Sequence, residues 1–187
     1  MEQNCLTDDA KEYLARFHEI LEEMINSMTA PKSTCSISLD FIERMIPHHR
    51  AAIEMCENIL KYTECEPLCA IAKNIICEQT KSIENLEKVK ECCAKKKNTN
   101  IDVCRYEKKT ECIMENMFSK MGNACKGNCI DQDFILEMIP HHLGAIEMSE
   151  NAMRFDICPR LRPILRDIIY SQRKGVNQMR SLLKNMK

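Results

Sequence analysis

The strongest constraint on the fold is an internal duplication, which becomes visible when the sequence is aligned with itself at a shift of 93 residues. At this shift residues 40–58 match residues 133–151 without a gap, and 14 of the 19 aligned positions are identical. Further pairs follow in the same register: Ile75 with Ile168, Ile76 with Ile169, and Gln79 with Gln172. Because self-similarity at a fixed period indicates a repeated structural unit, we predict two tandem copies, residues 1–93 and 94–187, packed together as one bundle.

Each copy has the pattern of three amphipathic helices, with apolar residues recurring every three or four positions. The chain is rich in Glu, Lys, Ile, Leu and Met and has only four glycines and no tryptophan, which favours an all-α fold. In copy one the predicted helices cover residues 7–28, 40–62 and 67–89. Asp40 followed by Glu43 is typical of a helix N-cap, and Pro67 suits a first turn. The polar run at 94–100 is the predicted linker between the copies, which makes the whole chain a helical bundle of two three-helix repeats.

Charge and hydropathy exclude two classes of partner. The formal net charge of −1 offers no basic surface for neutralising phosphates, so we expect no nucleic-acid binding. The sequence has no run of 18 apolar residues, so we expect no membrane span. The start of the chain lacks the features of a signal peptide, which predicts a cytoplasmic location as written and an extracytoplasmic one if a leader was removed.

Four of the five histidines form two identical doublets, each within the segment MIPHH. On a helix, His48 and His49 fall on the apolar half-circle with Met45 and Met55, and Arg44 and Asn58 fall on the opposite, polar arc. Copy two repeats the apolar arrangement with Met138, His141, His142 and Met148. These eight residues are the candidate metal ligands, and the methionines of the first helix in each copy extend the set: Met24, Met28, Met117 and Met121.

A buried imidazole needs partners for both ring nitrogens, because an unpaired buried polar group costs about 1 to 3 kcal/mol. A metal ion satisfies one nitrogen and leaves the other for a hydrogen bond. Pro47 lacks an N–H and so frees the carbonyl of Glu43, which is one possible partner. Gln79 and Gln172 interrupt apolar stripes and are candidate partners for the outer nitrogens.

Thioether and imidazole ligands together select Cu(I), with silver as its mimic, or another soft or borderline metal. The Glu-x-x-His pattern of di-iron bundles is missing, as is HExxH of zinc proteases. Because no organised acid, base or nucleophile accompanies the doublets, we expect a metal-binding protein without catalysis. Two alternatives remain open: the histidines are hydrogen-bonded core residues of a structural or partner-binding bundle, and the methionines are ordinary core fillers.

Thirteen cysteines are the second unusual feature of the composition. Cys56 and Cys77 are expected to be buried, whereas most of the others gather near helix ends and connections. A continuous inward stripe of thiols, which bulk Cu(I) storage requires, is not present. Disulfides and accessory thiolate capture of metal both remain possible at the helix ends, so a structural bundle with disulfides and thiolate-based copper storage stay open as alternative functions.

The pattern DFxxxMIPHHxxAIxM, followed by a helix carrying IIxxQ, resembles the bacterial family called domain of unknown function 305. The resemblance covers both copies and implies ferritin-like helical bundles, with copper binding and copper resistance in some members. It also implies that the family motif includes Met45, His48, His49 and Met55 and their copy-two counterparts. Members are typically exported. From residues and resemblance together we expect a protein of copper handling or tolerance, and a homo-oligomer is possible.

Overall fold

The computed structural model describes residues 6–124 and 127–186, and within them the chain forms α-helices and no strands. The all-α prediction is confirmed. The six helices, in chain order, are α1 (Asp8–Thr29), α2 (Ile37–Ile59), α3 (Glu66–Ala94), α4 (Asn100–Gly122), α5 (Ile130–Met153) and α6 (Leu161–Asn185). The segment predicted as the linker between the copies joins two helices, because α3 ends at Ala94 and α4 begins at Asn100.

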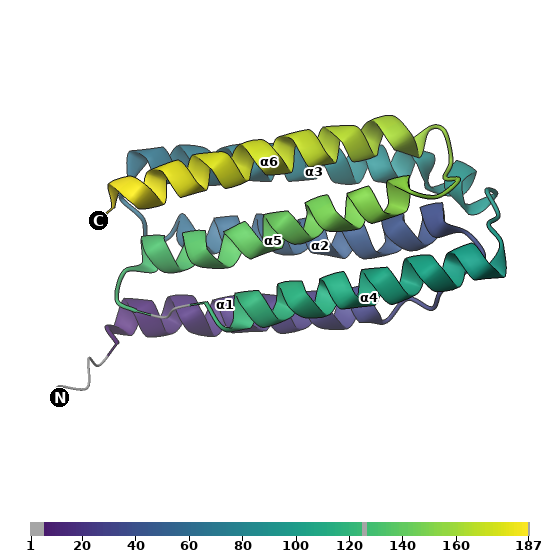
Figure 1. The fold of residues 1–187 in the computed structure, drawn as a ribbon. Coiled ribbons are helices and arrows are strands. Elements are labelled where there is room, and N and C mark those ends of the chain that lie inside the picture. Colours follow the sequence, from purple (N-terminus) through teal and green to yellow (C-terminus); the bar gives the residue numbers. More distant parts are fainter. Residues whose placement is uncertain (1–5, 125–126, 187) are drawn as a thin grey trace.

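The helices lie in three layers, and each layer holds one helix from each half of the chain (Figure 1). The pair α2 and α5 forms the middle layer, with α1 and α4 on one side and α3 and α6 on the other (Figure 1). In each layer the two helices begin 92 to 95 residues apart in the chain, close to the shift of 93 at which the sequence aligns with itself. Since α2 and α5 are covered from both sides, whatever side chains they carry inward lie at the centre of the molecule.

Side-chain caps set the starts of several helices. Thr7 caps α1 by accepting a hydrogen bond from the Ala10 N–H, and Thr99 caps α4 in the same way. The predicted cap at Asp40 is wrong, because Ser36 caps α2 and the helix begins one turn earlier, at Ile37. The Asp40 carboxylate instead accepts hydrogen bonds from the backbone N–H of Thr34, at 3.0 Å, and from its hydroxyl, at 2.7 Å. Asp40 therefore ties the α1–α2 connection to α2.

Two residues that we placed on the polar arc of α2 are buried. Arg44 is 5% exposed and forms an ion pair with Glu107 of α4, with 2.7 Å between Nη2 and Oε2. Asn58 is 3% exposed, and its Nδ2 donates to the Tyr13 carbonyl of α1 at 3.0 Å. The prediction failed because α2 lies in the middle layer, where neighbouring helices cover more than the apolar half-circle.

The outer helices keep polar faces toward solvent. Among the described residues the exposed large hydrophobic side chains are Ile101 and Tyr170. No helix in this part of the chain combines the length and the apolar character needed to cross a membrane.

Candidate metal centre

The two histidine doublets meet at the centre of the bundle, on the facing middle helices α2 and α5. All four imidazoles are buried, with exposed fractions between 0 and 2%. The rings of His48 and His141 stack with their centroids 3.7 Å apart and their planes at 29°. The doublets that the sequence separates by 93 residues therefore form one four-imidazole cluster.

His48 and His141 hold each other through reciprocal hydrogen bonds. Nε2 of His48 lies 3.2 Å from the carbonyl oxygen of His141, and Nε2 of His141 lies 3.1 Å from the carbonyl oxygen of His48. A carbonyl oxygen only accepts, so Nε2 carries the proton in both rings. In a neutral ring the other nitrogen, Nδ1, then holds a lone pair and acts as an acceptor.

The outer histidines of the two doublets have different surroundings. Nε2 of His49 is hydrogen-bonded to the Ser82 hydroxyl on α3, at 2.9 Å. The position equivalent to Ser82 in copy two is Gly175, where an added Cβ would lie 2.8 Å from Cδ2 of His142 and 2.9 Å from its Nε2. His142 thus packs directly against the α6 backbone in space that a side chain would otherwise fill.

Three buried nitrogens of this cluster are left without a hydrogen bond: Nδ1 of His48, His49 and His141. The ring of His142 has a hydrogen bond with the Met138 carbonyl, one turn before it on α5. Each unpaired buried polar atom costs about 1 to 3 kcal/mol, so three in one place are exceptional. In His48 and His141 the unpaired atom is the one with the lone pair. An arrangement of this kind is suited to donating to a cation.

Burial keeps the imidazoles neutral. Desolvation lowers the pKa of His49 to about 3 and that of His141 to about 4. For His48 and His142 desolvation, reinforced by the neighbouring imidazoles, moves the pKa well below its usual value. Protons therefore do not compete for the lone pairs near neutral pH.

The methionines predicted as ligands are all buried in the core, with exposed fractions of 0 to 2%. Met45 and Met138 lie one turn before the doublets on α2 and α5, and Met55 and Met148 lie two turns after the first histidine. The remaining four sit on the outer layer, on α1 and α4: Met24, Met28, Met117 and Met121. Within residues 6–124 and 127–186, no group of three or more His, Cys, Asp or Glu side chains is placed to hold a metal ion. The four imidazoles by themselves are therefore not such a group.

The hydrogen-bond partners differ from those predicted. Gln79 and Gln172 are buried, but Oε1 of each lacks a partner, and the residue that bonds a histidine is Ser82, three positions after Gln79. For His48 the partner is the His141 carbonyl rather than the carbonyl of Glu43 freed by Pro47. Ser82 was missed although its place one turn after Gln79 on the same face of the helix was a usable signal.

The surface near the doublets is open in one half and closed in the other. A groove of about 600 Å³ is lined by Met24 and Pro47, together with Glu23, Glu43, Glu54 and Glu87 and two cations, Arg50 and Lys90. The equivalent space beside Met117 and Pro140 measures about 10 Å³. Copy one therefore has a largely acidic groove that reaches a candidate methionine, and copy two does not.

Comparison with known proteins places the sequence in a family. The model of the family described as Domain of unknown function (DUF305) matches residues 38–183. The chain belongs to this family. A curated relative, "Uncharacterized protein L153" of Acanthamoeba polyphaga mimivirus, is 39% identical over 57 residues, which are 30% of this chain and 38% of the relative.

Solved structures share the fold. A DUF305 fragment from Deinococcus radiodurans covers 83% of this chain and 99% of its own length, with 20% identity and a TM-score of 0.58. CopM in an Ag-bound form is 28% identical with a TM-score of 0.58, and covers 79% of this chain and 95% of its own. CopM in its Cu(II)-bound form is 27% identical with a TM-score of 0.57, and covers 80% and 98%. The fold of this chain is thus found in proteins solved with bound copper and silver.

Proposed function

We propose that this protein binds copper as Cu(I) in the interior between α2 and α5, and that it serves copper handling or tolerance as a binder rather than an enzyme. The observation that carries the proposal is the pair of stacked imidazoles, His48 and His141. Each has its Nε2 proton committed to a carbonyl and its Nδ1 lone pair unpaired in the core. His49 and His142 add two further imidazoles, and the ligand set is completed by thioethers: Met45, Met55, Met138 and Met148.

The chemistry of the donors favours a soft monovalent ion. Neutral imidazole and thioether ligands suit Cu(I), whereas Mg²⁺ and Ca²⁺ require oxygen donors. The cost of burying an ion in a medium of low dielectric rises steeply with its charge, so a neutral ligand set in a dry core holds one positive charge more readily than two. CopM has been solved with Ag and with Cu(II) bound, which supports a copper site in this fold.

A structural role for the doublets is the competing function, and one observation favours it. Nε2 of His48, His49 and His141 already has a protein partner, as expected for hydrogen-bonded core histidines. This function leaves the unpaired Nδ1 atoms of His48, His49 and His141 without an explanation. The two functions differ in what happens at Nδ1 when a soft metal is added.

The test is an anaerobic Cu(I) titration of reduced protein against a chromogenic chelator, comparing wild type with the double variant His48→Gln/His141→Gln. We expect the variant to lose at least one tightly bound ion per chain. His18→Gln is the matched control, because His18 is exposed on α1 and its loss should leave the copper count unchanged. Circular dichroism checks that both variants keep their helices.

A second measurement identifies which ring nitrogen of His48 and His141 binds the metal. In ¹⁵N spectra of histidine-labelled protein, silver(I) should shift the Nδ1 resonances of His48 and His141 and leave Nε2 as the protonated nitrogen. An unchanged copper count in the double variant, or unchanged Nδ1 resonances on silver addition, would overturn the interior site and leave the structural role.

A further inference from the structure

Three cysteines from distant parts of the chain meet at one end of the bundle, away from the histidines. Cys92 and Cys93 lie in the last turn of α3, and Cys158 lies in the connection between α5 and α6. The sulfur atoms of Cys92 and Cys158 are 3.6 Å apart, and Cys93 also hydrogen-bonds Cys158. This group, called here the thiol cluster, consists of Cys92, Cys93 and Cys158.

The backbone around the thiol cluster is tied down on each side. The Ser36 hydroxyl donates to the Cys93 carbonyl at 2.8 Å, and the Cys158 N–H donates to the Ser38 hydroxyl at 2.9 Å. Nδ2 of Asn98 donates to the Asp156 carbonyl at 2.9 Å. The start of α2, the end of α3 and the α5–α6 connection therefore hold the three thiols together without a disulfide.

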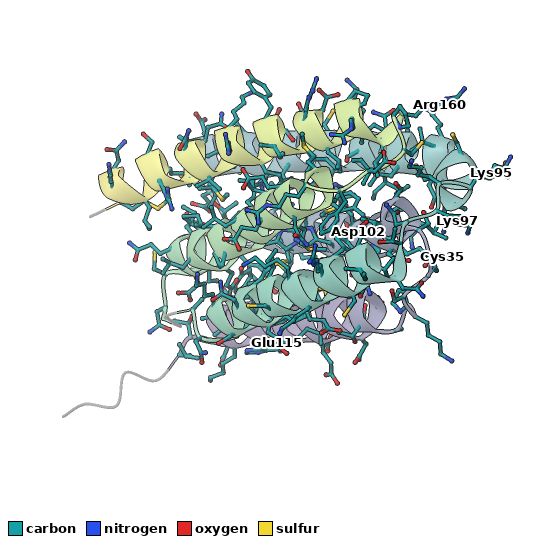
Figure 2. All side chains as sticks on the ribbon, turned by 45° about the vertical axis from the view of Figure 1, so that its right-hand side comes forward. Cys35, Lys95, Lys97, Asp102, Glu115 and Arg160 are labelled. Atoms are coloured by element: carbon teal, nitrogen blue, oxygen red, sulfur yellow. The ribbon has the colours of Figure 1, made fainter. Side chains whose placement is uncertain are left out.

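The surroundings of the thiol cluster favour negative charge on one of its three sulfurs, that of Cys158. Burial opposes ionisation of Cys158, but hydrogen bonds from the Arg160 N–H, from the two other thiols and from the Leu161 N–H outweigh it and lower the pKa of Cys158. The hydrogen bond to Cys158, together with burial, raises the pKa of Cys92, and the charges of Arg160 and Lys95 only partly oppose this. Burial raises the pKa of Cys93 to about 12, so a metal ion at this cluster would have to displace the thiol protons. Figure 2 shows Lys95 and Lys97 of the linker between the copies, and Arg160 of the α5–α6 connection, at the same end of the bundle.

We propose that Cys92 and Cys158 form a second soft-metal site, which binds one monovalent cation of the Cu(I) or Ag(I) class through two thiolates. Two sulfur–metal bonds form, and the thiol protons leave to solvent. A thiolate–metal bond is about 2.3 Å long, as for zinc, so a nearly linear site needs the sulfurs roughly 1 Å farther apart than they are, within reach of side-chain rotation. The bound group, two thiolates and one monovalent cation, carries a single negative charge that the basic linker offsets.

The duplication provides an internal control. The copy-two residue Cys158 corresponds to Cys65 in copy one, but the counterparts of Cys92 and Cys93 are Asn185 and Met186. Cys65 therefore has no equivalent second thiol. The thiol cluster breaks the symmetry of the repeat, and it does not depend on the histidine centre.

The test measures alkylation of individual cysteines by N-ethylmaleimide, read by peptide mass spectrometry, in reduced and anaerobic protein with and without two equivalents of Ag(I). We expect silver to slow modification of the half-buried Cys92 at least tenfold while the exposed Cys104 and Cys112 stay reactive. The protection should vanish in Cys158→Ser and persist in Cys65→Ser. It should also persist in His48→Gln/His141→Gln, which separates this site from the interior one.

Three results would overturn the thiol site. Equal modification rates of Cys92 with and without silver, or protection that survives Cys158→Ser, would show that these two sulfurs do not share a metal. Protection of Cys92 already complete before silver is added would assign the pair to a disulfide that withstands the reduction step. Loss of copper binding at the histidines would leave the outcome at Cys92 unaffected, so either proposal can fail alone.

Discussion

The two halves of the molecule present the same histidine doublet to the core but support it differently. In copy one the outer imidazole, His49, is held by the Ser82 hydroxyl, whereas in copy two His142 packs against the bare backbone of Gly175. A serine side chain and a hydrogen bond in one half are replaced by close van der Waals packing in the other. The comparison shows that a duplicated motif can keep its histidines while the residues that hold them in place diverge.

The same contrast recurs on the outer side of the middle helices. Ala51 lines the open groove of copy one, and its counterpart Gly144 allows Met117 to approach so closely that a Cβ there would lie 2.1 Å from the methionine sulfur. Arg50 is replaced by Leu143 in the closed space of copy two. Gly144 and Gly175 thus leave space that Met117 and His142 fill, and copy two is the more tightly packed half at these two positions.

Lowering the pH should produce the largest change in the free energy of unfolding. It also tests whether the two halves exclude water from their imidazoles equally well. The four imidazoles have lowered pKa values in the fold and ordinary values near 6.5 when unfolded. The unfolded chain therefore binds more protons below pH 6.5, and stability present above that pH is lost as pH falls toward 4. In metal-free protein, each imidazole should cost about 1 kcal/mol between pH 6.5 and 5.5, measured by urea unfolding. Burial raises the pKa of Glu107, so this carboxylate takes up its proton more readily in the folded state than in the unfolded chain. Glu107 therefore offsets the loss of stability in acid, by the uptake of at most one proton.

Single variants sharpen the acid measurement. His49→Gln and His142→Gln should each reduce the stability difference between the two pH values by a similar amount, because each removes one buried neutral imidazole. Equal reductions mean that serine and glycine shield the ring equally well. A reduction in only one variant would show that water reaches the other half, and the assumed equivalence of the doublets would be wrong.

The next effect in size comes from adding a methyl group in the tightly packed half. Gly175→Ala places a Cβ within 3 Å of the buried His142 ring, which is enclosed and has little room to move. We expect a loss of about 1 to 3 kcal/mol in the free energy of unfolding, measured by urea titration. Gly122→Ala is the matched control: no atom lies within 4 Å of its new Cβ and its φ is not positive, so it should stabilise by about 0.4 to 1 kcal/mol. Equal effects of the two variants would contradict the close packing of His142.

The sequence was sufficient for the fold because the relevant signals are periodic and local. The 3.6-residue pattern marks each helix, and the 93-residue shift marks the pairs that share a layer. The local pattern wrongly predicted that Arg44 and Asn58 are exposed, because burial on α2 depends on how many helices cover it. Caps were also partly misjudged: Ser36, rather than Asp40, satisfies the first N–H groups of α2.

For the candidate site, the sequence identified the residues but not the contacts between them. The inward position of His48, His49, His141 and His142 follows from helix geometry. The stacking of His48 on His141 depends on how α2 meets α5 across the bundle, and no pattern within one helix carries that information. Ser82 lies on a third helix, and it was missed although its place one turn after Gln79 puts it on the same inward face. The metal assignments of these residues remain predictions.

The smallest effect tests the polar support in copy one. Ser82→Ala removes the hydroxyl at 2.9 Å from Nε2 of His49 and leaves that nitrogen buried without a partner, which should cost about 1 kcal/mol of stability. Ser171→Ala is the matched control, because the Ser171 hydroxyl bonds only the Ile168 carbonyl of its own helix, and the change should stay within about 0.5 kcal/mol. Both are measured by urea unfolding at pH 7.

Ser82→Gly then gives copy one the residue that copy two has at Gly175. If His49 moves into the vacated space, its ¹⁵N ring resonances should approach those of His142. A Ser82→Ala cost no larger than that of the control would mean that His49, like His142, is held by packing, and the contrast between the halves would reduce to the groove beside Met24.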